Sequence, residues 1–232
     1  SWYPWRGEFG FYPFIAGTFW VTALAMILAI PVCLLSAIYL AEYAPDNWLT
    51  GVIRYGVELL AGVPSIIFGL FGFAIFVIAL NFSYSILAGA LTLACLLLPF
   101  LVRTAEEAIR AVPTSYREGA LALGATKWQT ITRVVVPIAL PGIITGIILC
   151  VGRAVAESAC LYVTMGGSAK MPDSFLSGGR PLAVHIFYLA TETNALDKAL
   201  ATGAVLIMLI LIINLMTRGL AWRFRAQMEG KA

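Results

Sequence analysis

Two ionisable residues stand close together inside a long apolar stretch of the chain. Arg153 and Glu157 are four residues apart, so both would lie on one face of a regular helix. A charged group inside a membrane costs at least ~2.5–3.5 kcal/mol on insertion scales, so such residues usually face a cavity or a partner. An arginine can hold an oxyanion through paired, charge-assisted hydrogen bonds, whereas a glutamate repels it. We expect the pair either to line a polar path or to form a static ion pair between helices.

Small residues recur at every fourth position beside this pair. They are Gly142, Gly146, Cys150, Ala154 and Ser158. A ridge of small side chains lets membrane helices pack closely. The helix is therefore expected to pack by this edge and to present Arg153 and Glu157 to an interior.

A second set of candidate residues lies between Thr104 and Arg133, where signals for helix ends are dense. Three pairs match the capping box, in which two side chains satisfy free amides at a helix start: Thr104 with Glu107, Ser115 with Glu118, and Thr126 with Gln129. Pro113 and Gly124 are expected to end helices. The segment is therefore predicted to form three short helices, the central one near Tyr116 to Leu123.

The small residues of that central helix would let another protein backbone approach it. Gly119 and Ala120 leave room for contact, and Leu121 supplies apolar surface. A helix of two turns is not stable alone in water. It must therefore be held by its own membrane domain or by a partner protein.

The composition places these residues in a membrane protein. Of the 232 residues, 61% are hydrophobic and only 12% are charged, whereas soluble domains carry roughly 25% charged residues. Too little polar surface remains to cover a water-soluble globule, so the bilayer must be the solvent. We expect membrane lipid as a partner and no nucleic acid.

Uncharged stretches predict five membrane-spanning helices. One lies between Glu8 and Glu42; the 44 uncharged residues between Glu58 and Arg103 are too long for one crossing and should reverse near Asn81 to Ser85. A fourth span covers 134–165, with Arg153 and Glu157 inside it, and a fifth covers 199–217. Pro64 is the best candidate for a broken helix. The fold class is thus an all-α, polytopic helical bundle, with one transmembrane domain over residues 1–232.

The positions of lysine and arginine between the spans predict the orientation. The positive-inside rule assigns the side with more of them to the cytoplasm. That side carries Arg54, Arg103, Arg110, Arg117, Lys127, Arg133, Arg218, Arg223, Arg225 and Lys231, and the other carries Arg6, Lys170, Arg180 and Lys198. The loop 104–133 and the C-terminus should be cytoplasmic and the loop 164–196 external, which would be natural if the first of six spans were missing.

The sequence offers little for catalysis or nucleotide binding. His185 is the single histidine and lies outside the expected spans, and the four cysteines resemble buried hydrophobic residues more than a metal site. No Gly-x-x-x-x-Gly-Lys-Ser/Thr loop occurs. We expect no catalytic or metal-binding residue and no bound cofactor, although a passive channel and an intramembrane enzyme stay open as weaker alternatives.

Two sets of motifs resemble a known family. Glu118-Gly119-Ala120, followed by Gly124 and by Val134 to Pro137, resembles the cytoplasmic Glu-Ala-Ala signature of type I ABC-importer permeases, with Gly119 in place of the middle alanine. The runs Glu42 to Pro45, Pro64 to Leu70, Val102 to Ala125 and Ser177 to Leu182 resemble phosphate-importer permeases of the PstA type. The resemblance extends from about Gly17 to Arg225.

The resemblance implies that the chain is the inner-membrane permease of an ATP-driven importer of inorganic phosphate. It also implies a PstC-like permease subunit, a PstB-like ATPase dimer that binds ATP and Mg²⁺, and a PstS-like phosphate-binding protein as partners. Sulfate or molybdate is the alternative cargo. The implied site residues are Arg153 and Glu157 on the substrate path, and Glu118, Gly119, Ala120, Leu121, Gly124 and Pro137 in coupling to the ATPase.

Overall fold

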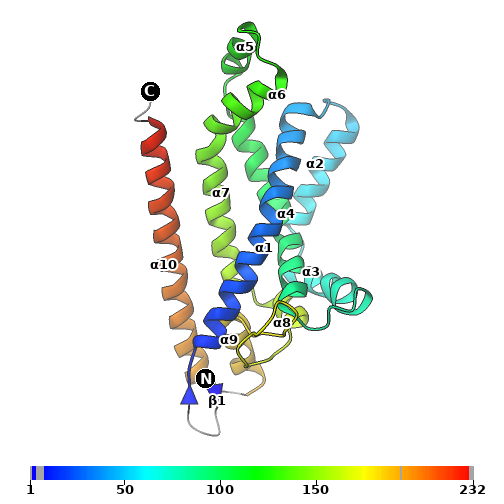
Figure 1. Ribbon diagram of the computed structural model, residues 1–232. Helices are drawn as coiled ribbons and strands as arrows, with labels where there is room; N and C mark the ends of the chain where they lie inside the picture. The colour runs from blue at the N-terminus through cyan, green and yellow to red at the C-terminus, as the bar shows by residue number, and fades with distance from the viewer. Residues whose placement is uncertain (1, 4–7, 194, 230–232) are drawn as a thin grey trace. The chain divides into compact units, whose positions relative to one another are not determined.

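Helices make up nearly all of the structure, a computed structural model that describes residues 2–3, 8–193 and 195–229 (Figure 1). The helices are α1 (Tyr12–Ile38), α2 (Trp48–Ala61), α3 (Ser65–Gly72), α4 (Ile86–Arg110), α5 (Thr114–Ala122), α6 (Lys127–Thr130), α7 (Val136–Ala156), α8 (Ala159–Met165), α9 (Leu182–Thr191) and α10 (Leu196–Glu229). Three π-helices, η2 (Tyr39–Tyr43), η3 (Phe73–Ala79) and η4 (Ile131–Val135), continue helices α1, α3 and α6. A two-residue pair, β1 (Trp2–Tyr3) and β2 (Glu8–Phe9), precedes α1. The predicted all-α class is confirmed.

The apolar helices match the predicted spans with one interruption. Within the described residues, α1 with η2, α4, α6 to α7, and α10 are each long and apolar enough to cross a membrane. The fifth candidate is the pair formed by α2 and the α3–η3 segment, which is bent at a break. Pro64, with its extended ψ of 138°, stands at this break immediately before α3. The break predicted at Pro64 is confirmed, as is the reversal near Asn81 to Ser85, where Asn81 and Ser83 have positive φ.

The predicted fourth span ends earlier in the chain than expected. Helix α7 ends at Ala156 instead of running to Met165, because Ser158 leaves the helical region with φ −121° and α8 begins at Ala159. The break allows α8 to lie against α3, where a Cβ built on Gly69 would stand 2.8 Å from the Cα of Cys160. The prediction of one regular helix carrying both Arg153 and Glu157 is therefore wrong.

Of the three predicted capping boxes, one forms. Thr126 and Gln129 cap α6 reciprocally, as expected. Thr104 lies inside the continuous helix α4 and donates its hydroxyl to the carbonyls of Phe100 and Leu101, so no helix begins there. Pro113 occupies the N-cap of α5 without a side-chain hydrogen bond, so the predicted box of Ser115 and Glu118 is also absent.

The internal contacts of the chain define two compact units. Unit 1 comprises Ser1–Ala29, Val63–Leu97 and Val151–Leu215, and unit 2 comprises Ile30–Gly62, Leu98–Cys150 and Met216–Ala232. In unit 1, Phe14 and Leu182 belong to one buried cluster that also includes Leu189. In unit 2, Ile109 and Val135 belong to another. Arg6 and Lys231, two of the cations from which the orientation is predicted, lie outside the described residues.

The predicted small-residue ridge of α7 packs closely within unit 2. A Cβ on Gly142 would stand 2.8 Å from the Cβ of Ala108, and one on Gly146 would stand 2.7 Å from the hydroxyl of Thr104. Real Cβ atoms do not approach other atoms so closely, so both positions need glycine. The close packing of this edge, against the C-terminal half of α4, is confirmed.

Candidate functional site

Helix α5 lies at the surface of unit 2, with most of its residues exposed. None of its residues is buried, and the Leu123 side chain that follows it is 91% exposed. Gly124 then stops the helix with φ +84°, as its position in the sequence predicted. Helices α5 and α6 lie at one end of unit 2, beyond the end of α4 and the start of α7 (Figure 1). The α5 surface is therefore free to meet another protein.

Five of the six predicted coupling residues gather at α5. Glu118, Gly119 and Ala120 lie within the helix, Leu121 is half exposed near its end, and Gly124 follows. A Cβ on Gly119 would meet nothing within 4 Å, so this position is open to a close approach from outside. The sixth residue, Pro137, lies in the first turn of α7 and is exposed.

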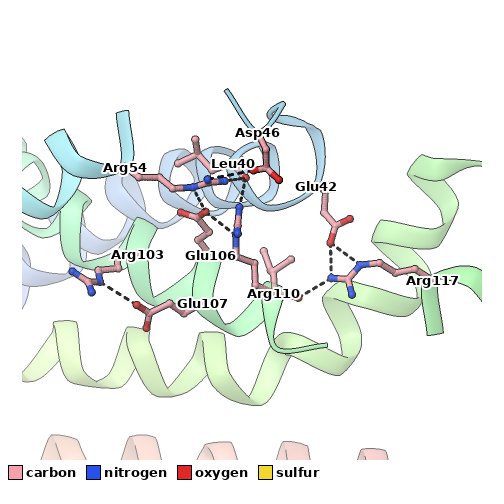
Figure 2. Close-up of polar contacts among 10 residues, drawn as sticks. Leu40, Glu42, Asp46, Arg54, Arg103, Glu106, Glu107, Arg110 and Arg117 are labelled. Atoms are coloured by element: carbon pink, nitrogen blue, oxygen red, sulfur yellow. Dashed lines mark hydrogen bonds and ion pairs between the residues drawn. The ribbon is translucent and has the colours of Figure 1, made fainter. Parts of the chain in front are cut away.

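An arginine of α5 holds the helix to the rest of unit 2. Arg117 Nη2 lies 2.7 Å from Glu42 Oε1 in η2, and Arg117 Nε donates to the same oxygen at 3.1 Å (Figure 2). Arg117 also donates to the carbonyls of Ile109 and Val112. Nothing in the local sequence predicts this pair, although Glu42 lies in the run Glu42 to Pro45 that resembles PstA-type permeases.

A cluster of charged side chains lies beside η2. Glu106 of α4 is only 8% exposed; it accepts a hydrogen bond from Arg54 Nε at 2.8 Å and forms an ion pair with Arg110 Nε at 3.0 Å (Figure 2). The same two arginines also donate to the carbonyl of Leu40, at 2.8 and 3.4 Å. Arg103 pairs with Glu58 and Glu107. These residues and the Glu106 cluster line one cavity of about 230 Å³.

The two predicted substrate-path residues are near each other in the chain but unpaired. Arg153 lies exposed in the last turn of α7, and Glu157 lies half-buried just past its end. Among the described residues, no ion pair joins Arg153 to Glu157. The static ion pair that the sequence left open is therefore not formed in this structure, and the role of the two residues in a path stays a prediction.

A third polar group surrounds Arg180 in unit 1. Arg180 is buried before α9; its Nε donates to the Gly167 carbonyl at 2.9 Å, and its guanidinium lies 3.9 Å from the centre of the Tyr188 ring. Burial and the nearby Arg180 charge lower the pKa of His185 to about 3, so this imidazole is neutral at physiological pH. His185 also stacks on Phe14, with ring centres 3.7 Å apart. This group anchors the start of α9 in the core.

The described residues contain no grouping suited to a metal. Nowhere in ranges 2–3, 8–193 and 195–229 do three histidine, cysteine, aspartate or glutamate side chains come together as a metal site. Among the described residues these cysteines form no disulfide: Cys33, Cys150 and Cys160 are buried, and Cys95 is half-buried.

Solved structures with the same fold belong to ABC importers. The match to a chain of the inward-facing MetNI methionine ABC transporter covers 93% of this chain and 94% of the transporter chain, with a TM-score of 0.68 and 19% identity. A bacterial alginate ABC transporter in complex with an alginate pentasaccharide-bound periplasmic protein covers 92% and 78%, with a TM-score of 0.71 and 17% identity. The chain therefore has the fold of the membrane subunits of type I ABC importers.

Sequence relatives identify the family within this class. Residues 33–226 match the binding-protein-dependent transport system inner membrane component, and the chain belongs to this family. The chain is 38% identical over 219 residues to the probable ABC transporter permease protein YqgI of Bacillus subtilis, covering 88% of this chain and 74% of the relative. It is also 38% identical over 209 residues to the phosphate transport system permease protein PstA 1 of Mycobacterium tuberculosis, covering 89% and 68%. It is thus a multi-pass inner-membrane permease subunit.

Proposed function

We propose that this chain is the permease subunit of an ATP-driven importer of inorganic phosphate and forms half of its translocation path. The observation that carries the proposal is the exposed helix α5, which presents the Glu-Ala-Ala-like residues with no buried side chain of its own. Arg117 ties this short helix to its own unit, and most of its surface stays open to a partner. The names of the PstA relatives support phosphate as the cargo.

The energy for transport would come from a separate subunit. We infer a PstB-like ATPase dimer that binds ATP and Mg²⁺ and receives α5 on its surface, so that this chain needs no nucleotide site. A PstC-like permease would supply the other half of the path, and a PstS-like protein would deliver phosphate. In this arrangement the loop 104–133 and the C-terminus face the cytoplasm, and the loop 164–196 faces the binding protein.

Arg153 and Glu157 are the residues proposed to meet the cargo. Arg153 is exposed and unpaired with Glu157, so its guanidinium is available to form two charge-assisted hydrogen bonds to a phosphate. Glu157 would repel the anion and shorten its stay beside the arginine. Release matters as much as binding, because a site that holds the anion too tightly stops transport.

Uptake by the reconstituted complex tests the proposed function. The chain is placed in proteoliposomes with its permease, ATPase and binding-protein partners, and uptake of radiolabelled phosphate is followed with and without ATP. We expect ATP-dependent uptake that excess unlabelled phosphate suppresses and excess sulfate or molybdate does not. Uptake without ATP would indicate a passive channel, and suppression by sulfate or molybdate would indicate the other oxyanion as cargo.

Replacement of Arg153 tests the path. Arg153→Ala should lower phosphate uptake by about 10- to 100-fold, since a charged hydrogen bond contributes roughly 1.5–3 kcal/mol. The matched control is Arg218→Ala. Arg218 is an exposed arginine of α10, and it forms no ion pair with any side chain that the structure describes. Both variants should co-purify with the ATPase. Normal uptake by an assembled Arg153→Ala complex would remove Arg153 from the path.

A further inference from the structure

The π-helix η2 interrupts the regular hydrogen bonding at the end of α1. Its five residues, Tyr39–Tyr43, close with a bond from the Ala44 amide to the Tyr39 carbonyl at 2.8 Å. Single-turn π segments are uncommon and occur frequently at functional sites. In such a wider turn the normal helical partners of nearby carbonyls are displaced, so these carbonyls can accept bonds from side chains.

On one side, η2 is fixed to α2 and α4. The Leu40 carbonyl of η2 accepts from Arg54 at 2.8 Å and from Arg110 at 3.4 Å (Figure 2). Both arginines are in turn held by the buried carboxylate of Glu106. Three elements of unit 2 therefore meet at one carbonyl of η2, and a displacement of η2 must change these bonds.

On the other side, η2 is fixed to the exposed loop. Glu42 accepts two hydrogen bonds from Arg117 of α5, and Lys127 at the start of α6 lies 4.7 Å from the centre of the Tyr43 ring. The side chains of Arg117 and Glu42 are only 19% and 9% exposed. Because water competes weakly there, this pair is expected to be stronger than a pair at the surface.

Arg117 is suited to transmit a displacement of α5. None of the residues of α5 is fully buried, so its apolar contact with the rest of the unit is limited. The planar guanidinium of Arg117 joins it at once to Glu42 in η2 and to the carbonyls of Ile109 and Val112 at the end of α4. A fork with several simultaneous acceptors fixes orientation as well as distance.

We propose that Arg117 and Glu42 form the positioning pair through which a movement of α5 reaches η2 and, from it, the membrane helices. This inference rests on the proposed docking of α5 to an ATPase. The competing route runs through η4, which α5 also contacts and which leads directly into α7. If the Arg117–Glu42 pair is the route, its loss should lower transport while ATP hydrolysis persists. If η4 is the route, loss of the pair should leave transport coupled to hydrolysis.

The test measures phosphate transported per ATP hydrolysed in the complete complex. Arg117→Gln and Glu42→Gln should each lower this ratio by about five-fold or more, the smaller end of typical coupling between sites, while ATP hydrolysis and co-purification with the ATPase persist. The double variant should be no worse than either single one, because the two residues act as a unit. Arg117→Lys should recover part of the ratio, since a lysine can still pair with Glu42 but lacks the fork. Arg218→Gln is the matched control and should keep the wild-type ratio.

Each contrary result has a distinct meaning. An unchanged ratio in Arg117→Gln, or additive losses in the double variant, would overturn the inference and favour the η4 route. Loss of ATPase co-purification from Arg117→Gln would also overturn it, because Arg117 would then act in docking. If the wild-type complex itself shows no ATP-dependent uptake of any oxyanion, the proposed function fails and the positioning role fails with it.

Discussion

At the scale of residues, the carboxylate of Glu106 is nearly buried between two arginines of unit 2. It neutralises two arginines that also hold the Leu40 carbonyl. Removing one member of an enclosed charge group leaves the remaining charges without compensation. Glu107, the next residue, has a 65% exposed side chain and a single exposed partner, so its environment is nearly aqueous.

Substitution of the two glutamates should separate these environments. Glu106→Gln is expected to destabilise the protein by about 1–3 kcal/mol, less than for a fully buried pair because Arg110 is 46% exposed. Glu107→Gln should change stability by less than about 1 kcal/mol. Thermal unfolding of both variants in the same detergent gives the comparison. Equal unfolding temperatures would show that the Glu106 cluster contributes no net stability.

At the scale of elements, the short helices α3 and α8 depend on close contact between backbones. Gly69 of α3 faces Cys160 and Val163 of α8, at distances that leave no room for a methyl group. Small residues at such crossings let membrane helices gain van der Waals contact along their lengths. The neighbouring atom at Cys160 is a backbone Cα, so a side-chain rotation cannot relieve the clash.

A single methyl group therefore tests the α3–α8 contact. Gly69→Ala should destabilise the protein by about 1–3 kcal/mol, the usual cost of overpacking. Gly56→Ala in α2 is the matched control, because a Cβ there would meet nothing within 4 Å. We expect the control to unfold at or slightly above the wild-type temperature, since alanine favours helix more than glycine. A Gly69→Ala protein as stable as the control would contradict the packing.

At the scale of the whole molecule, the distribution of lysine and arginine sets the expected orientation in the membrane. The positive-inside rule assigns the α5 end to the cytoplasm and the segment around Lys170 to the other side. The proposed docking of α5 depends on this orientation, because ATP is hydrolysed in the cytoplasm. The orientation can be measured independently of transport.

Introduced cysteines report the orientation directly. Leu123→Cys, at a 91% exposed position, should react with a membrane-impermeant maleimide in inverted vesicles and not in right-side-out vesicles. Lys170→Cys should show the opposite pattern, because it lies in the loop predicted to be external. The native cysteines are buried or half-buried, so background labelling should be low. Labelling of Leu123→Cys from the outside would exclude the proposed docking.

The sequence by itself determined the features that depend on local chemistry. Apolar stretches predicted where helices cross the membrane, because hydropathy follows from composition alone. Pro64 marked a helix break, because proline restricts its own backbone. Gly124 marked a helix end, because glycine can adopt a positive φ. The small residues of α7 predicted an edge that packs closely on another helix, because small side chains leave room for it.

Only the tertiary structure decided how polar groups choose between competing partners. Thr104 matched the capping pattern, but it lies in the interior of α4. Its hydroxyl therefore donates to the carbonyls of Phe100 and Leu101, one turn earlier in the helix. Arg117 and Glu42 are 75 residues apart, and nothing in their local sequence states that they meet. Which charges pair across such a distance in the sequence depends on how the helices pack. Helix packing is determined by many weak contacts spread over the whole chain. The Arg117–Glu42 pair and the Glu106 cluster therefore came into view only with the fold.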